Sequence, residues 1–167
     1  SVEVSVFFSR EVSLTNGTIS NFMTADNTTF TFDVTAQDNG EVEISIPEGV
    51  AEDHVANENL ASNELIITVD QTNPAVTISS LETSPTNAAS IPITITFSEE
   101  ISVFSSNDVS ITNGTISSFS TADNIVYTFN AQPTITAGSL TISVAEDVTS
   151  DLAGNENEAS NQISLTI

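Results

Sequence analysis

Two short stretches of acidic and amide side chains recur in the chain, and their residue types are suited to binding a metal ion. The later stretch is Asp151-Leu-Ala-Gly-Asn-Glu-Asn-Glu-Ala-Ser160, and the earlier one is Asp53-His-Val-Ala-Asn-Glu-Asn-Leu-Ala-Ser62. Both keep an Asp, an Asn-Glu-Asn run four residues later and a closing Ala-Ser. Carboxylate and amide oxygens are the ligands that Ca²⁺ prefers in proteins. The repetition predicts an oxygen-ligand site for a hard cation, with a polar hairpin loop as the alternative.

The charge balance restricts the partners that the chain can bind. It has 23 acidic residues, one Arg, no Lys and a formal net charge of -22 at pH 7. Nucleic-acid binding requires Lys and Arg, and an anionic membrane surface repels a polyanion, so we expect neither partner. Self-repulsion on this scale favours divalent metal, high salt or both. The chain has no Cys and its single His is His54, which excludes a zinc site built from these ligands.

An internal repeat organises the chain. The segment Val12-Ser-Leu-Thr-Asn-Gly-Thr-Ile-Ser matches Val109-Ser-Ile-Thr-Asn-Gly-Thr-Ile-Ser at an offset of 97, and the two acidic stretches match at an offset of 98. Extended forward, the alignment pairs Ser1 with Ser98, so the first copy lacks the first two strands of the second. We expect a piece of a longer tandem array, with donation of strands by another chain as the alternative.

The repeat predicts a truncated domain over residues 1–69, a linker over residues 70–74 and a complete domain over residues 75–167. No apolar run approaches the roughly 18 residues of a membrane span, so we expect no membrane insertion. No signal peptide precedes the first copy, which favours an internal fragment of a mature polypeptide.

The complete copy contains seven segments in which apolar and polar residues alternate, as in half-buried strands. These segments are residues 75–79, 91–97, 109–112, 115–119, 126–130, 140–144 and 162–167. The pair Asn113-Gly114 predicts a tight hairpin turn between the third and fourth strands. Seven short strands without a helical period predict an all-β fold of tandem immunoglobulin-like β-sandwiches. A barrel is the structural alternative.

Antiparallel strands alternate in direction, so successive loops lie at alternate ends of the sandwich. We therefore expect the acidic loops to meet at the end where the linker enters. The candidate ligands there are Asp70, Glu99, Glu100, Asp123, Asp151, Asn155 and Asn157. The candidates in the first copy are Glu3, Asp53, Asn57 and Asn59, without a counterpart of Asp70. Ca²⁺ suits flexible loops better than Mg²⁺, and solvated acidic loop tips are the alternative.

Several segments together resemble bacterial immunoglobulin-like (Big) domains. They are Thr96-Phe-Ser-Glu-Glu-Ile101, Asp108-Val-Ser-Ile-Thr-Asn-Gly114, Tyr127-Thr-Phe, Asp151-Leu-Ala-Gly-Asn-Glu-Asn157 and the preceding Val69-Asp-Gln-Thr-Asn-Pro-Ala-Val76. The resemblance implies stalk or spacer modules of a bacterial surface or secreted adhesin, with neighbouring Ig-like domains of the same polypeptide as partners. It also implies an extracellular location. Because several members of the family bind Ca²⁺ at interdomain linkers, the resemblance implies that role for Asp70, Glu99 or Glu100, Asp151, Asn155 and Asn157.

A ligand- or glycan-binding adhesive module is the alternative function. Glycan sites often present aromatic rings, but the chain has one Tyr, nine Phe and no Trp, and most of the Phe occupy alternating strand positions typical of a core. If the chain is a spacer, a host, surface or glycan ligand would instead be bound elsewhere in the protein. We do not expect an enzyme, because no nucleophile–base pair or Gly-rich phosphate loop is visible and His54 has no counterpart in the second copy.

Overall fold

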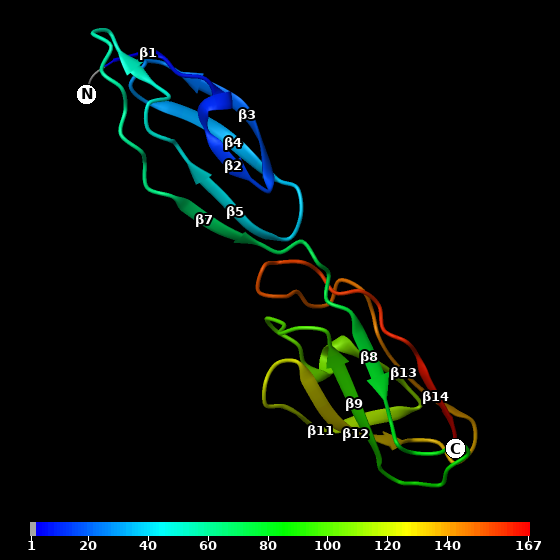
Figure 1. Cartoon of the computed structure of the whole chain (residues 1–167). Helices are drawn as coiled ribbons and strands as arrows, with labels where there is room; N and C mark the ends of the chain where they lie inside the picture. Colours follow the sequence, from blue (N-terminus) through cyan, green and yellow to red (C-terminus); the bar gives the residue numbers. More distant parts are fainter. Residues whose placement is uncertain (1–2) are drawn as a thin grey trace. The chain divides into compact units, whose positions relative to one another are not determined.

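The computed structural model describes residues 3–167, which form two compact units divided between Gln71 and Thr72 (Figure 1). Both units consist of β-strands joined by loops and single-turn 3-10 helices, η1 (Ser9–Glu11) in the first and η2 (Ser106–Asp108) in the second. None of the helices in the described chain is long and apolar enough to span a membrane.

The second unit is a sandwich of two antiparallel sheets. One sheet has the order β11-β12-β9-β8, and the other has the order β10-β13-β14. The first contains β8 (Val76–Ser79), β9 (Ile91–Phe97), β11 (Gly114–Thr121) and β12 (Val126–Pro133). The second contains β10 (Val109–Thr112), β13 (Ser139–Val144) and β14 (Ile163–Thr166). This four-plus-three grouping is that of an immunoglobulin-like sandwich, so the all-β prediction is confirmed.

The core of the second unit lies between the inner faces of its two sheets. On β9, every second side chain from Ile91 to Phe97 is at most 2% exposed. Leu140, Ile142 and Val144 of β13 face them from the other sheet and are at most 1% exposed. Burying one such side chain contributes roughly 1.5–3 kcal/mol. The period of two along each strand therefore both places and stabilises the core.

The predicted hairpin at Asn113-Gly114 is wrong, because β10 and β11 belong to different sheets. Asn113 adopts a left-handed backbone conformation with φ 63°, and its Nδ2 donates a hydrogen bond to the Ser139 carbonyl at 2.8 Å. A Cβ on Gly114 would lie 2.5 Å from Leu140 Cδ1, so the chain needs glycine there as it crosses between sheets. Asn tolerates left-handed backbone in hairpins and crossings alike, so the dipeptide alone does not separate them.

A β-bulge in β11 explains how Ile116 and Phe119 both contact the core although three positions separate them. The pairing of β11 with β12 shifts register between Ser117 and Ser120, and Ser118 within the shift has φ 56°. The extra residue reverses the alternation of faces, so that both apolar side chains point inward.

The first unit contains the counterparts of five strands of the second. In one sheet, β2 (Ser13–Thr15), β5 (Gly40–Ser45) and β7 (Leu65–Val69) have the order β2-β5-β7, matching β10-β13-β14. β3 (Gly17–Thr24) pairs with β4 (Phe30–Ala36), as β11 pairs with β12. A short pair joins β1 (Val4–Val6) to β6 (Glu52–Asp53). Among residues 3–71, no strand of the structure corresponds to β8 or β9.

Candidate metal centre

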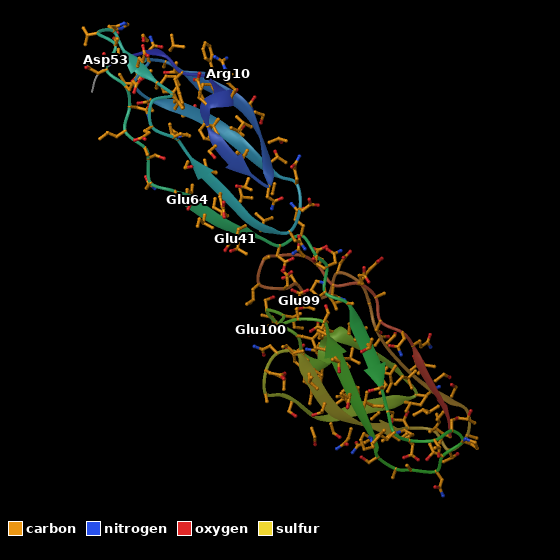
Figure 2. All side chains as sticks on the ribbon, viewed as in Figure 1. Arg10, Glu41, Asp53, Glu64, Glu99 and Glu100 are labelled. Carbon is orange, nitrogen blue, oxygen red and sulfur yellow. The ribbon has the colours of Figure 1, made fainter. Side chains whose placement is uncertain are left out.

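Three segments that are distant in sequence meet at the end of the second unit where β8 begins. The Ile101 N–H donates to the Asn124 carbonyl at 3.1 Å, which joins the loop after β9 to the β11–β12 turn. The Ser102 N–H donates to the Ser150 carbonyl at 2.8 Å, which joins the same loop to the segment after β13. Figure 2 labels Glu99 and Glu100 at this end. The convergence follows from the alternating strand directions, as the sequence predicts.

Two carboxylates come together there. One oxygen of Glu99 lies within 4.8 Å of one oxygen of Asp151. Glu99 is half-buried and Asp151 is 3% exposed. Asp70 precedes the division between the two units, so within the second unit the structure groups two of the seven ligands predicted for this copy.

Asp151 is a buried carboxylate that stays ionised. Its Oδ1 accepts hydrogen bonds from the N–H groups of Gly154 at 2.6 Å and Asn155 at 2.9 Å, and its Oδ2 accepts one from Asn155 Nδ2 at 2.8 Å. Burial by itself raises the pKa of this carboxyl, but the hydrogen bonds from Asn155 and Gly154 outweigh it and hold the pKa below the ordinary value. A carboxylate has about four acceptor positions. The Ala153 backbone also contributes a hydrogen bond, so the Asp151 carboxylate is already well engaged within its own loop.

Asn157 supports the loop, because every hydrogen-bonding position of its side-chain amide is engaged. Its Oδ1 accepts from the Val148 and Thr149 N–H groups, both at 3.0 Å. Its Nδ2 donates to the Ala145 and Glu158 carbonyls, both at 2.8 Å. The residue is only 1% exposed. These four hydrogen bonds hold the backbone of the loop after β13 in place. They leave the amide no free position for binding a metal ion.

Two further candidates lie at the same end, outside the carboxylate cluster. Glu100 Oε1 accepts a hydrogen bond from Asn124 Nδ2 at 3.3 Å. Asp123 Oδ1 accepts from the N–H groups of Val126 at 2.8 Å and Ile125 at 3.0 Å, and these bonds lower its pKa. Both carboxylates add negative charge around the cluster, while their nearest contacts shape the β11–β12 turn.

The candidates of the first copy repeat the loop but do not gather three carboxylates. Asp53 Oδ1 accepts from the Val55 and Asn57 N–H groups and Oδ2 accepts from Asn57 Nδ2, all at 2.9 Å. The bonds from Asn57 hold its pKa below the ordinary value. Glu3 Oε2 instead lies 3.2 Å from His54 Nε2.

Asn59 is the counterpart of Asn157 and makes the same four contacts. Its Oδ1 accepts from the Val50 and Ala51 N–H groups, and its Nδ2 donates to the Pro47 and Leu60 carbonyls. The amide pattern that the repeat preserves is therefore accounted for by loop structure in both units, independently of any metal.

The sequence interpretation missed a serine that ties these loops together. Ser102 Oγ donates to the Ser150 carbonyl at 3.0 Å, and its repeat counterpart Ser5 donates to the Glu52 carbonyl at 2.9 Å. The signal was present, because Ser5 and Ser102 occupy the same place in the aligned copies. Exposed serines are common in alternating segments, however. The role of this one cannot be recognised without knowing which loop its hydroxyl contacts.

Comparison with known protein families matches residues 70–167 to the family described as "Bacterial Ig-like domain". No curated protein matches the chain. The matched range begins at Asp70 and covers Glu99, Asp151 and every strand of the second unit.

Proposed function

Because the chain belongs to the family of bacterial Ig-like domains, we propose that it serves as a structural spacer in a bacterial surface adhesin or extracellular filament, stiffened by Ca²⁺. The family match and the sandwich support a structural or adhesive module. The family match supports an extracellular setting, where Ca²⁺ is abundant. The observation that carries the calcium proposal is the approach of the Glu99 and Asp151 carboxylates within 4.8 Å, to which the sequence adds Asp70 as a further predicted ligand.

The donor set of this cluster fits Ca²⁺. Glu99 and Asp151 offer hard oxygen ligands, and so does Asp70, the third carboxylate of the proposed set. Ca²⁺ takes six to eight oxygens in loose geometry, which backbone carbonyls and water complete. The chain has no Lys, and its single Arg is Arg10 in the first unit, so no basic side chain of the second unit offsets this charge. A divalent cation would supply the missing positive charge.

The ion would hold the linker, residues 70–74, against the loops of the second unit. Asp70 lies four residues before Pro74, whereas Glu99 and Asp151 belong to loops that follow β9 and β13. A single ion held by all three side chains would fix the linker against those loops. In its absence the like charges repel one another. Binding would therefore restrict the motion of residues 70–74 and raise the stability of the second unit.

Calorimetric melting of the full chain in Ca²⁺ and in EDTA tests the proposal. Free Ca²⁺ at 100 times Kd should stabilise the second unit by about 2.7 kcal/mol. Glu99→Gln and Asp70→Asn should each remove most of this shift. Glu156→Gln makes the same change of charge at an exposed position in the loop that carries Asp151, and should leave the shift intact.

Two outcomes would contradict the proposal that Ca²⁺ binds and stiffens the linker. One is an equal melting temperature with Ca²⁺ and with EDTA. The other is a shift that NaCl reproduces at matched ionic strength, since screening alone would then explain it. Stiffening has its own measurement, because NMR relaxation of the amides of residues 70–73 should show less fast motion once Ca²⁺ is added.

A further inference from the structure

The first and last segments of the second unit are joined by hydrogen bonds that belong to neither sheet. β8 ends the four-stranded sheet and β14 ends the three-stranded one, and within residues 72–167 the two strands are not paired with each other. The Glu158 N–H, on the segment that leads to β14, nevertheless donates to the Pro74 carbonyl at 2.9 Å. Pro74 lies just ahead of β8, so this bond connects the first segment of the unit to its last.

Asn161 makes the central connection, because its side-chain amide takes the place of a neighbouring strand. Its Oδ1 accepts a hydrogen bond from the Ile78 N–H at 2.8 Å, and its Nδ2 donates to the Ile78 carbonyl at 3.0 Å. A side-chain amide carries both a donor and an acceptor, as a backbone peptide group does. It therefore satisfies both backbone groups of a residue on the edge of the sheet, which would otherwise face solvent or another strand.

Thr166, the last residue of β14, makes the third connection. Its N–H donates to Ser84 Oγ and its carbonyl accepts from the Thr86 N–H, both at 2.9 Å. The bonded positions advance from 74 to 86 in the first segment and from 158 to 166 in the last, in the same order. The two segments therefore run parallel, with five hydrogen bonds between them. Figure 1 shows β8 pointing away from the linker and β14 leading to the C-terminus at the far end of the unit.

This arrangement decides how the second unit responds to a pull along its strands. Tension between the linker and the end of β14 draws the first segment toward one end of the unit and the last segment toward the other. Hydrogen bonds between strands run across the strand direction, so this pull shears them. Bonds loaded in shear share the force and must break together, whereas bonds at the end of a peeled hairpin break one at a time. The links at Pro74, Ile78 and Thr166 are therefore placed to resist extension.

We propose that residues 74–86 and 158–166 form a mechanical clamp, with Asn161 at its centre, by which the second unit resists tension. This inference rests on the proposed spacer function, since a spacer transmits the pull between the parts that it separates. Asn161 is exposed, so burial in the core does not explain its contacts. Both of its hydrogen bonds reach across to β8, while its own segment continues into β14. Removing the amide breaks the clamp and leaves the apolar interior intact.

The test measures how fast single molecules of the full chain unfold under a constant force. The chain has no Cys, so introduced cysteines provide unique attachment points. Asn73→Cys together with a cysteine added after Ile167 stretches the second unit alone, along the clamp. Asn161→Ala should then make unfolding at least about tenfold faster, because two hydrogen bonds no longer oppose the force. Ser84→Ala removes one of the bonds at Thr166 and should act in the same direction.

Two controls separate the clamp from general stability. Attachment through Ser110→Cys and Thr128→Cys, which are exposed on different sheets, applies the force outside the clamp, and there Asn161→Ala should leave the rate nearly unchanged. Ser102→Ala also removes two side-chain hydrogen bonds at an exposed position, but neither belongs to the clamp. It should have little effect on unfolding along the clamp.

The proposal is overturned if Asn161→Ala speeds unfolding equally in both directions of pull, or if it has no effect along the clamp. Equal acceleration by Ser102→Ala and Asn161→Ala along the clamp would overturn it as well. Each of these results leaves the spacer proposal to its own test, because the Ca²⁺-dependent melting shift does not involve Asn161.

Discussion

Replacing Asn157 with alanine tests whether this side chain stabilises the loop or serves as a metal ligand. The side chain is 1% exposed and makes four hydrogen bonds to backbone groups, between 2.8 and 3.0 Å. A hydrogen bond in a protein contributes about 0.5–1.5 kcal/mol, and buried groups that lose their partner cost more. Asn157→Ala should therefore lower the free energy of unfolding of the second unit by roughly 4 kcal/mol.

The first unit offers a matched control in Asn59→Ala. Asn59 makes the same four contacts at 2.7–2.9 Å, but the residue is only half-buried. Water can reach the groups that its removal leaves, so the expected loss is about 1–2 kcal/mol in the first unit.

Urea unfolding of the full chain, followed by hydrogen exchange that reports on each unit separately, measures both losses. Asn157→Ala should destabilise the second unit and leave the first unchanged. The reasoning is refuted if Asn157→Ala costs less than about 1 kcal/mol, since four buried bonds cannot be removed at so small a cost. It is also refuted if Asn59→Ala and Asn157→Ala cost the same, because burial would then make no difference.

Two other predictions concern the crossing between sheets and the tyrosine. Gly114→Ala should destabilise the second unit by about 1–3 kcal/mol in urea unfolding, because the new Cβ would lie 2.5 Å from Leu140 Cδ1. Gly17→Ala, where the nearest atom is 3.1 Å away, should cost less. Burial, and then the charges of Asp123 and Glu100, raise the pKa of Tyr127, so phenolate absorbance should appear at higher pH in the folded chain than in urea. The stability linked to this proton is complete below pH 10 and is lost as the pH rises through the raised pKa. Glu100→Gln should lower that pKa, and an unchanged titration would contradict the assigned cause.

The fold could be predicted because local pattern and long-range packing agree along most strands. In β9, the residues that alternate in sequence from Ile91 to Phe97 are the ones the sandwich buries. The prediction failed at Asn113, where the sequence signal is a left-handed backbone conformation and not a strand pairing. Whether such a turn closes a hairpin or crosses between sheets depends on β10 pairing with β13, which is a distant segment.

The site could be predicted only in part, because ligands and loop supports use the same residue types. Strand direction brings Glu99 and Asp151 to one end, and that step needs no side-chain detail. An amide oxygen can bind a metal ion or accept hydrogen bonds from a loop. The role of Asn157 can therefore be assigned only once the positions of its four backbone partners are known. The repeat could not decide either, since Asn59 preserves the amide contacts in the first unit, where no three carboxylates gather among residues 3–69.

The start of β8 links the core of the second unit to the candidate metal centre. The Glu158 N–H donates to the Pro74 carbonyl at 2.9 Å, so the segment that begins β8 is fastened to the loop after β13. That loop carries Asp151, and β8 pairs with β9, which Glu99 follows. Because the alternate side chains of β9 fill the core, the packing that closes the sandwich also sets where β9 ends. Closing the sandwich and bringing Glu99 to Asp151 therefore depend on the same strand.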